Sequence, residues 1–524
     1  MGRDTKPSFI TELPLEVTPK QESSILVRLE FARQLYNACL GEGLRRLALM
    51  HQSKAYQSAQ YIPKDEKHKK ERQVAFGEAR KTHGFREYDL HAYAATIQIG
   101  WIGSSVVQKV ATRAFDAVSM YAFGKRGLPR FKGRGQFDSV EGKQNTVLSW
   151  NGKEVVWGGL VMPAIFLDPK RKGNDVINHG LAAPLKYVRL VRRKLNGKNR
   201  FYVQLVCEGR PFQKEKNTVG EGLVGLDIGP STIAIAAPNA KKGELRQFCN
   251  ELEHDQKGIR RLQRKLDRQR RGGNPQNYEP DGTVKKGKKE WHASKGYKKT
   301  REKIAEKHRK QAEHRESLHG QLVNHVFSLG NEIKLEKLSY RAFQRMFGKS
   351  IGMRAPGMFV SLLKRKAVSA GVSVTEFPTH STKLSQVCQC GQVKKKLLSE
   401  RWHVCGCGVV AQRDLFSAFL ASCVEDGRLN ADLARNFWQS GMDTCLTAAL
   451  SEIQPASDGL LPATFGLGRS QSGSPEKSWE KVGDSRGVVA SEPASRQRRE
   501  PNKAYPIPRT SPPLGVGSGQ CDPF

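Results

Sequence analysis

Residues 222–236 read GLVGLDIGPSTIAIA and decide how the middle of the chain folds. Positions 223–228 are apolar except for a glycine and Asp227, and a second β-rich run follows at 232–237. Two short apolar runs separated by Gly-Pro-Ser predict a buried β-hairpin. An aspartate at the end of a buried strand is costly unless it is paired or binds a cation. Asp227 alone leaves two roles open, a cap of the turn and a cation ligand.

Two further acids occur in comparable settings downstream. Glu336 lies at the C-terminal end of a strand expected within 331–338, NEIKLEKL, where apolar and charged residues alternate. A helix at 356–370 and a strand at 371–377 are expected next, and strand–helix–strand order predicts parallel pairing in an α/β core. Asp414 lies in the first turn of the following helix, where an aspartate most often serves as a cap or dipole partner.

Composition narrows the class of protein. The 524 residues carry a net charge of +37, which points to a polyanionic partner, nucleic acid before anionic membrane. No run of 18 apolar residues exists, so we expect no membrane span, and residues 1–20 do not resemble a signal peptide. Only four of the ten cysteines form tight pairs, which favours a reducing, cytoplasmic setting over a secreted disulfide framework.

The paired cysteines predict a metal site. Cys388 and Cys390 precede a glycine, and Cys405 and Cys407 do the same after a 14-residue interval. Two such knuckles are typical of a zinc ribbon, in which four thiolates hold a structural Zn²⁺ with no open position for chemistry. Both pairs are one residue shorter than the usual Cys-x-x-Cys, so a reduced ribbon without metal remains an alternative, as does replacement of one ligand by His403.

The first 215 residues change from helical to β patterns. Residues 18–21, Thr-Pro-Lys-Gln, predict a capped helix start, and another amphipathic helix is expected near 104–121. For the helical region before residue 128, a plain helical bundle is the alternative interpretation. Residues 128–215 contain short β runs, including a hairpin around Asn-Gly at 196–197. We interpret 128–215 as a small basic β-barrel or β-sheet module.

A long basic insertion follows the Asp227 hairpin. Residues 257–315 contain 21 Lys or Arg and 7 Asp or Glu, arranged as two helices around a loop at 272–289. Such a hairpin is either a solvated face or a contact for the phosphate backbone, and the one-sided charge favours the contact. The candidate nucleic-acid-binding cations of the whole chain are Arg130, Lys132, Arg192, Arg193, Arg260, Arg261, Arg264, Lys265 and Arg268.

The three acids suggest one shared site. An α/β sheet can bring two strand ends and a helix start together, although these residues are far apart in sequence. Three carboxylates in one site repel one another unless cations neutralise them, and hard oxygen ligands favour Mg²⁺ or Mn²⁺. Two such ions about 4 Å apart can activate water and stabilise the leaving oxygen of a phosphodiester. We therefore predict a nuclease that uses Asp227, Glu336 and Asp414.

The order of these motifs resembles the TnpB family of transposon-encoded RNA-guided DNA endonucleases and the related type V CRISPR effectors. The resemblance covers residues from about 15 to about 425 and is strongest over 220–425. The chain departs from the family pattern in its shortened cysteine pairs and in Phe416, where the family usually has Asn. The matching segments are GLDIG at 225–229, LEKL at 335–338, the cysteine pairs and RDLFSA at 413–418, with ARQLYN at 32–37, LPRFK at 128–132 and STKLSQVC at 381–388 as further support.

The resemblance implies a specific architecture and activity. A RuvC-like, RNase H-type α/β nuclease domain would carry the three acids as catalytic ligands of two Mg²⁺. A guide RNA would pair with target DNA, and an N-terminal lobe would read a short flanking motif, in a prokaryotic, nucleoid-associated protein. The implied domains are a wedge β-barrel at 1–25 and 128–215, a helical recognition lobe at 26–127, the nuclease domain at 220–385 and 409–430 with its basic helical insertion at 250–330, and the zinc ribbon at 386–408.

The sequence is also compatible with other functions. A nuclease-inactive RNA-guided repressor, a zinc-ribbon DNA-binding protein without guide RNA, and a transposase that joins strands would share many of these features. Whether the protein belongs to a transposon or to a CRISPR system is equally open. The segment 455–524 holds ten of the 25 prolines and is expected to be disordered.

Overall fold

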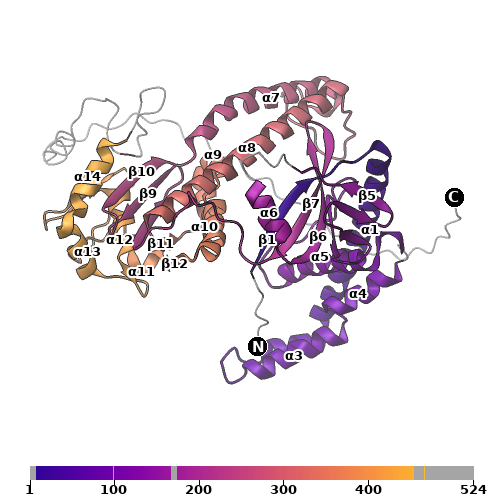
Figure 1. The fold of residues 1–524 in the computed structure, drawn as a ribbon, viewed down its shortest axis with the longest axis horizontal. Coiled ribbons are helices and arrows are strands. Elements are labelled where there is room, and N and C mark those ends of the chain that lie inside the picture. Colours follow the sequence, from indigo (N-terminus) through magenta and orange to yellow (C-terminus); the bar gives the residue numbers. More distant parts are fainter. Residues whose placement is uncertain (1–6, 98–99, 167–173, 398, 454–464, 466–524) are drawn as a thin grey trace. The chain divides into compact units, whose positions relative to one another are not determined.

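The computed structural model describes residues 7–97, 100–166, 174–397, 399–453 and 465 (Figure 1). The expected disordered tail at 455–524 therefore lies outside the described residues, apart from position 465. Among the described residues, no helix combines the length and apolar character that crossing a bilayer requires.

Helices form the part that precedes the β-rich module. The capping box at the start of α1 is confirmed, because the Thr18 hydroxyl accepts from the Gln21 amide at 3.3 Å and the Gln21 side chain accepts from the Thr18 amide at 2.9 Å. Helix α5 packs along α1 and matches the amphipathic helix expected near 104–121. The helices are α1 (Pro19–Gln52), α2 (Lys54–Tyr61), α3 (Lys69–Thr82), α4 (Glu87–Thr96) and α5 (Ser104–Ala122).

Two antiparallel sheets make up the β-rich module. The hairpin around Asn196 and Gly197 is confirmed, and both turn residues have positive φ, +49° and +79°, as a type I′ turn requires. A bridge between Leu15 and Ala164 connects the edges of the two sheets. The four-stranded sheet has the order β1 (Ser8–Pro14), β7 (Lys198–Glu208), β6 (Leu185–Leu195), β2 (Ser139–Lys143), and the three-stranded sheet consists of β3 (Leu148–Trp150), β4 (Glu154–Trp157) and β5 (Leu160–Pro163), with α6 (Asn174–Ala182) between β5 and β6 in sequence.

A mixed five-stranded sheet organises the second half of the chain. The hairpin predicted from residues 222–236 is confirmed as antiparallel β8 and β9, and the predicted parallel pairing is confirmed for β11 and β12. Strand β8 also pairs with β11 in parallel, which was not predicted. The strand expected at 371–377 begins two residues later, at Ser373, and forms one edge of the sheet, while β10 forms the other. The sheet order is β10 (Lys242–Gln247), β9 (Thr232–Ala237), β8 (Leu223–Ile228), β11 (Glu332–Lys337), β12 (Ser373–Pro378).

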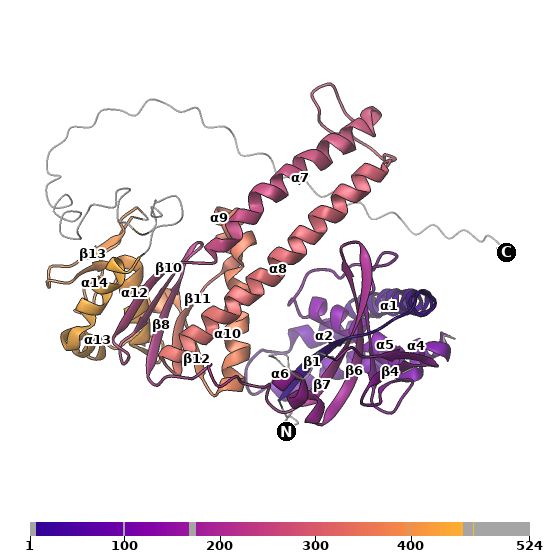
Figure 2. The same ribbon diagram turned by 45° about the horizontal axis from the view of Figure 1, so that its top comes forward.

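Helices cover both faces of this sheet (Figures 1 and 2). Val224, Leu226 and Ile228 alternate along β8 and pack with α8 (Lys295–Leu329) and α10 (Pro356–Ala370). Gly225 faces the other way, against α12 (Arg413–Ser422). Strand alternation thus separates an apolar face of β8 from the face that carries Asp227.

Several elements were not expected from the sequence. Helix α9 (Tyr340–Arg354) lies between Glu336 and α10, and its apolar residues at 340, 343, 347 and 351 recur at helical spacing, a pattern that could have predicted it. Helices α13 (Ala431–Phe437) and α14 (Asp443–Ser451) follow α12, and α14 packs on the edge strand β10.

The remaining helices and strands are α7 (Glu253–Gly272), α11 (Thr379–Thr382), β13 (Trp402–Val404), β14 (Val410–Gln412), β15 (Val424–Glu425) and β16 (Arg428–Leu429).

The contact of α12 with β8 leaves no room for a side chain at position 225. A Cβ atom there would lie 1.9 Å from the Ala418 carbonyl oxygen, so we expect Gly225→Ala to destabilise the protein by about 1–3 kcal/mol and to lower its melting temperature. Gly320→Ala, in the middle of α8 with no atom within 4 Å of the new methyl, is the matched control. This control is expected to raise stability by about 0.5–1 kcal/mol. Equal melting temperatures for the two variants would contradict the packing argument.

Candidate functional site

Asp227 and Glu336 occupy equivalent positions on neighbouring parallel strands. Leu226 of β8 pairs with Leu335 of β11, so each acid is the next residue toward the carboxyl end of its strand. Neighbouring strands lie about 4.8 Å apart, and residues in register point to the same face. The strand register therefore brings these two carboxylates side by side on the face that α12 covers.

Asp414 reaches the same place from α12. The helix crosses β8 at Gly225, where the Ala418 carbonyl and the Ser422 amide would be the nearest atoms to a Cβ. Asp414 lies one helical turn before Ala418, and Asp227 lies two residues after Gly225. The Asp414 side chain is only 15% exposed and contacts Arg413, with 3.3 Å between Nε and Oδ1, and Arg401, with 3.9 Å between Nη1 and Oδ2.

The three acids affect one another electrostatically. Burial, followed by the charges of Asp414 and Glu336, raises the pKa of Asp227 well above its usual value, while Arg413 opposes this shift. Burial raises the pKa of Glu336 to about 7. Carboxylates from β8, β11 and α12 thus form one electrostatic unit. Such a unit favours either bound protons or a bound cation.

The four cysteines form a compact cluster. Their sulfur atoms all lie within 4.8 Å of one another, with 3.6 Å between Cys388 and Cys407 and between Cys390 and Cys405. This separation is too long for a disulfide and close to the ~3.8 Å between sulfurs that a tetrahedral Zn²⁺ with 2.3 Å bonds requires. The donors and their spacing fit zinc, despite the shortened pairs.

The two knuckles are built alike. The Cys388 amide donates to the Gln392 carbonyl at 2.8 Å, and the Cys405 amide donates to the Val409 carbonyl at 3.0 Å. Gly391 and Gly408, which follow the pairs, have φ of +90° and +91°. A positive φ is accessible to glycine at little cost, which explains the glycine after each cysteine pair.

His403 lies outside the cysteine cluster. It is 3% exposed, its ring lies 4.4 Å from that of Phe416, and its Nδ1 contacts the Lys396 ammonium group. Burial, together with Lys396 and Lys394, lowers the pKa of His403 to about 4. The histidine therefore packs between the ribbon and α12, and Phe416 fills that contact.

The cysteine ribbon, residues 386–412, is continuous with the helix that carries Asp414. Strand β14 ends at Gln412, whose side chain accepts from the Leu415 amide at 2.8 Å and so caps α12. Gln412 is 1% exposed. The orientation of the first turn of α12 therefore depends on the fold of the ribbon.

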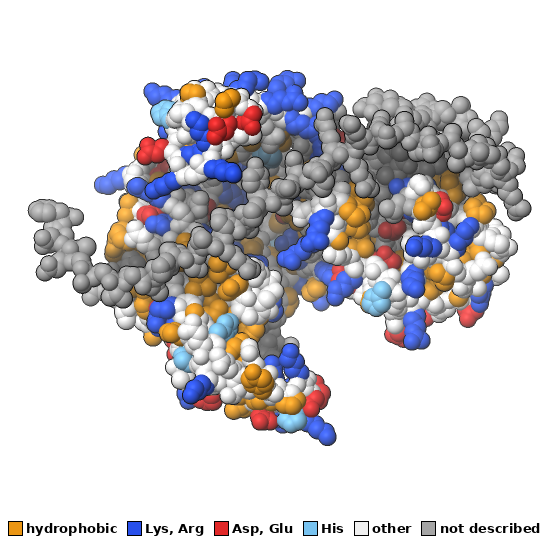
Figure 3. Space-filling model, turned by 180° about the vertical axis from the view of Figure 1, so that it is seen from behind, with side chains coloured by type: hydrophobic (Ala, Val, Ile, Leu, Met, Phe, Trp, Pro, Cys, Tyr) orange, Lys and Arg blue, Asp and Glu red, His pale blue; other side chains and the backbone are white. Residues whose placement is uncertain are grey.

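The candidate nucleic-acid-binding residues fall into two groups. Arg192 is ion-paired with Asp138, and Arg193 holds Glu12 through two bonds of 2.6 and 2.7 Å. These two arginines already have protein partners. The remaining candidates are exposed, and no ion pair joins them to another described residue: Arg130, Lys132, Arg260, Arg261, Arg264, Lys265 and Arg268. Figure 3 shows Lys and Arg side chains gathered over the α7–α8 hairpin near the top of the view.

Comparison with known proteins gives distant structural neighbours. No protein-family model and no curated protein matches the chain. A cryo-EM structure of a Cas12f1–sgRNA–target DNA complex is similar with a TM-score of 0.45 and 10% identity, over 79% of this chain and 98% of that one. A cryo-EM structure of a CRISPR–Cas12f ternary complex gives a TM-score of 0.28 and 13% identity, over 77% and 82%. At these scores, function has to be argued from the residues of this chain.

Crowding of the acids predicts a pH-dependent stability. A carboxyl group with a raised folded-state pKa stabilises the fold at low pH, and this contribution is lost as pH rises through that pKa. In EDTA, we expect the melting temperature to fall between about pH 5 and pH 8, because Glu336, whose pKa is about 7, and Asp227 lose their protons. Asp227→Asn is expected to melt higher than the unsubstituted protein at pH 8 and to differ less at pH 5. An equal difference at both pH values would contradict the electrostatic coupling.

Zinc removal tests the link between the ribbon and α12. We expect one zinc per chain by elemental analysis, and loss of that zinc in Cys390→Ser, because three thiolates bind more weakly than four. The variant should also show faster amide hydrogen exchange in the first turn of α12. Cys445→Ser, at a cysteine outside the cluster, is the control and should keep its zinc. Retained zinc in Cys390→Ser would exclude a four-cysteine site.

Proposed function

We propose that this chain is an RNA-guided DNA endonuclease that hydrolyses target DNA in a RuvC-like site. The main support is the electrostatic coupling of Asp227 with Glu336 and Asp414, which come from three separate elements. A second support is the net charge of +37, which suits a polyanionic substrate. The sheet with its helices would be the nuclease domain at 220–385 and 409–430, to which we add α13 and α14.

Asp227, Glu336 and Asp414 would hold two Mg²⁺ or Mn²⁺ ions. Carboxylate oxygens are suitable ligands, and among the described residues only the cysteines bring three or more donor atoms within 4.8 Å of one another. The oxygens of the three acids therefore do not all lie within 4.8 Å of one another in the structure. When bound, such ions supply an activated water and stabilise the leaving oxygen of the phosphodiester.

Neighbouring side chains orient one acid, and burial sets the protonation of another. Arg413 and Arg401 contact the Asp414 carboxylate and restrict its orientation. Glu336 has to release a proton before it can bind a cation, and because its pKa is about 7, activity should fall as pH decreases below 7. The apolar side of β8 packs on α8 and α10 and keeps the strand ends rigid.

Guide RNA and target DNA would be the partners. Exposed cations on α7, with Arg130 and Lys132, would contact phosphates without reading sequence, while base pairing with the guide selects the target. The zinc ribbon at 386–408 would be structural. The two β-sheets with residues 1–25 would form the wedge, and residues 26–127 would be the lobe that reads the flanking motif.

The proposal is tested by guided cleavage. RNA that copurifies with the protein is sequenced, and plasmids with matching and scrambled targets, each beside a randomised flank, are incubated with the complex and Mg²⁺. We expect cleavage of the matching plasmid only, and a loss of at least about 100-fold in Asp227→Ala, since metal-holding acids supply several kcal/mol to the reaction. Glu313→Ala, at an exposed acid of α8, is the control.

Other outcomes would identify other functions. Guided binding without cleavage in the unsubstituted protein would indicate a repressor, and joined product DNA would indicate a transposase. Absence of any defined bound RNA would favour a zinc-ribbon DNA-binding protein. A transposon-encoded nuclease and a type V CRISPR effector would behave alike in this assay, and the origin of the copurified RNA distinguishes them.

A further inference from the structure

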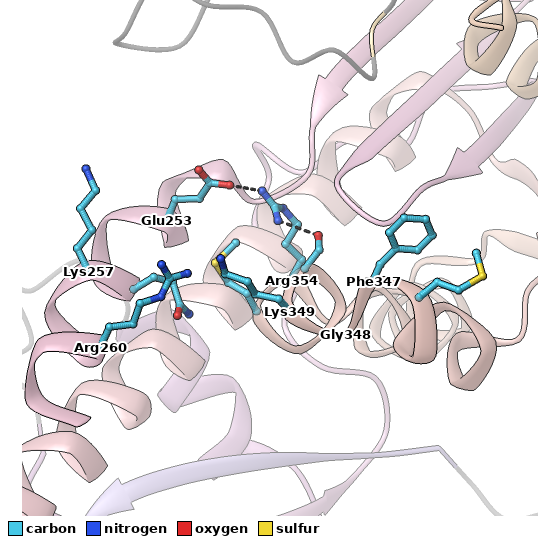
Figure 4. A pocket seen from close by; sticks show the side chains of 11 residues that line it. Glu253, Lys257, Arg260, Phe347, Gly348, Lys349 and Arg354 are labelled. Atoms are coloured by element: carbon cyan, nitrogen blue, oxygen red, sulfur yellow. Dashed lines mark hydrogen bonds and ion pairs between the residues drawn. The ribbon is translucent and has the colours of Figure 1, made fainter. Parts of the chain in front are cut away.

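A pocket of about 530 Å³ opens between α7 and α9, close to the proposed catalytic edge (Figure 4). Helix α9 begins at Tyr340, four residues after Glu336. The Ser350 hydroxyl on this helix donates to the Pro230 carbonyl at 2.6 Å, and Pro230 lies in the turn that follows Asp227. Ser350, which lines the pocket, thus contacts the turn that follows the strand of Asp227.

Three cations stand around the pocket without an ion pair to another described residue. Lys257 and Arg260 come from α7, and Lys349 comes from α9, and all three are exposed. Arg354 differs, because it pairs with Glu253 at 2.5 Å (Figure 4). It also donates to the Phe248 carbonyl at 2.7 Å. Arg354 thus ties α9 to the start of α7, while the other three charges remain available to a ligand.

The same pocket offers an apolar surface. Phe347 is 40% exposed and Met346 is 65% exposed, which is unusual for two adjacent large apolar residues. Helix α9 departs from helical geometry at Phe347, where φ is −124° and ψ is 32°. Phe347 also ends a row of aromatic rings on α9, with 6.3 Å from Tyr340 to Phe343 and from Phe343 to Phe347. The row runs from near Glu336 to the pocket.

We propose that this pocket binds one nucleotide of the DNA strand that is cut, next to the scissile phosphodiester. Its base would lie against Phe347 and Met346, and its phosphates would contact Lys257, Arg260 and Lys349. The inference rests on the proposed function, because the pocket would hold the DNA strand that is cut in the proposed nuclease site. The volume lies within the usual range of small-ligand pockets.

The ligand should be single-stranded. A base in a duplex is stacked on both faces and cannot lie on a protein side chain, whereas an unpaired base can. Aromatic side chains together with free cations are the usual surface for single strands, and each stacked base contributes about 1–3 kcal/mol. Stacking on one phenylalanine requires no particular base, which suits a strand whose sequence is selected elsewhere.

The test uses the RNA-loaded full chain and three variants. Phe347→Ala and Lys349→Ala are expected to slow single-turnover cleavage of a matched target by about tenfold, the lower part of the range for one stacked base. Phe347→Tyr keeps an aromatic ring and should restore the rate. Binding of the matched duplex by gel shift, and the melting temperature, should stay unchanged. Lys310→Ala, an exposed cation of α8 outside the pocket, is the control.

Failure of this inference can be distinguished from failure of the proposed function. If the unsubstituted complex cuts and Phe347→Ala cuts at the same rate, the pocket does not hold the strand, and the nuclease proposal stands. If the unsubstituted complex does not cut, the nuclease proposal fails, and binding of a fluorescent ten-nucleotide single-stranded DNA decides on the pocket. Weaker binding in Phe347→Ala and Lys349→Ala, but not in Lys310→Ala, supports the pocket, and equal binding overturns it.

Discussion

The close approach of α12 to β8 is the contact on which the candidate site depends. At Gly225 the strand has no side chain, and the backbone of α12 around Ala418 and Ser422 occupies that space. Any larger residue would push the helix away from the sheet. Because Asp414 is one turn from this contact and Asp227 is two residues from it, the missing side chain sets the distance between two acids. Gly225 therefore affects both the packing of α12 on the sheet and the spacing of the acids in the candidate site.

This approach has an electrostatic cost. Packing α12 onto the sheet removes water from Asp227 and brings Asp414 toward it, and both effects raise the pKa of Asp227. A protein without a cation ligand would gain stability by replacing one of these acids with an apolar residue. Retention of three acids at this contact is understandable if a cation binds there. Locally unfavourable arrangements, such as these buried and mutually repelling acids, are typical of functional sites.

Much of the five-stranded sheet could be predicted from sequence, because its strands are short apolar runs with clear ends. The pairing of β8 with β9, and the parallel pairing of β11 with β12, follow from local pattern and from the order of elements. The position of Asp414 relative to Asp227 could not be derived in this way, since it depends on a backbone contact between α12 and β8. The sequence predicted the grouping only from residue type and the order of elements, and the resemblance to TnpB proteins agrees with it.

Other features had no signal in the sequence. Arg192 and Arg193 resemble their exposed neighbours in a basic hairpin, yet both pair with acids that are more than 50 residues away. Helix α9 has apolar residues at helical spacing and could have been predicted, whereas the bend at Phe347 and the exposure of that side chain could not. Its partly exposed aromatic residues contradict the usual expectation that such side chains are buried, and this contradiction is visible only once their exposure is known.

The cap of α12 shows how the ribbon and the acids fit together. A helix start usually has Asp, Ser, Thr or Asn as its cap, whereas here Gln412 bonds the Leu415 amide. An aspartate at 412 would add a fourth negative charge beside Asp227, Glu336 and Asp414. A neutral amide satisfies the free N–H group without that charge, and its longer side chain suits a residue that still belongs to strand β14. Gln412, at the end of the ribbon, thus caps α12 without adding charge. Asp414 remains the acid that interacts with the positive N-terminal end of the helix dipole.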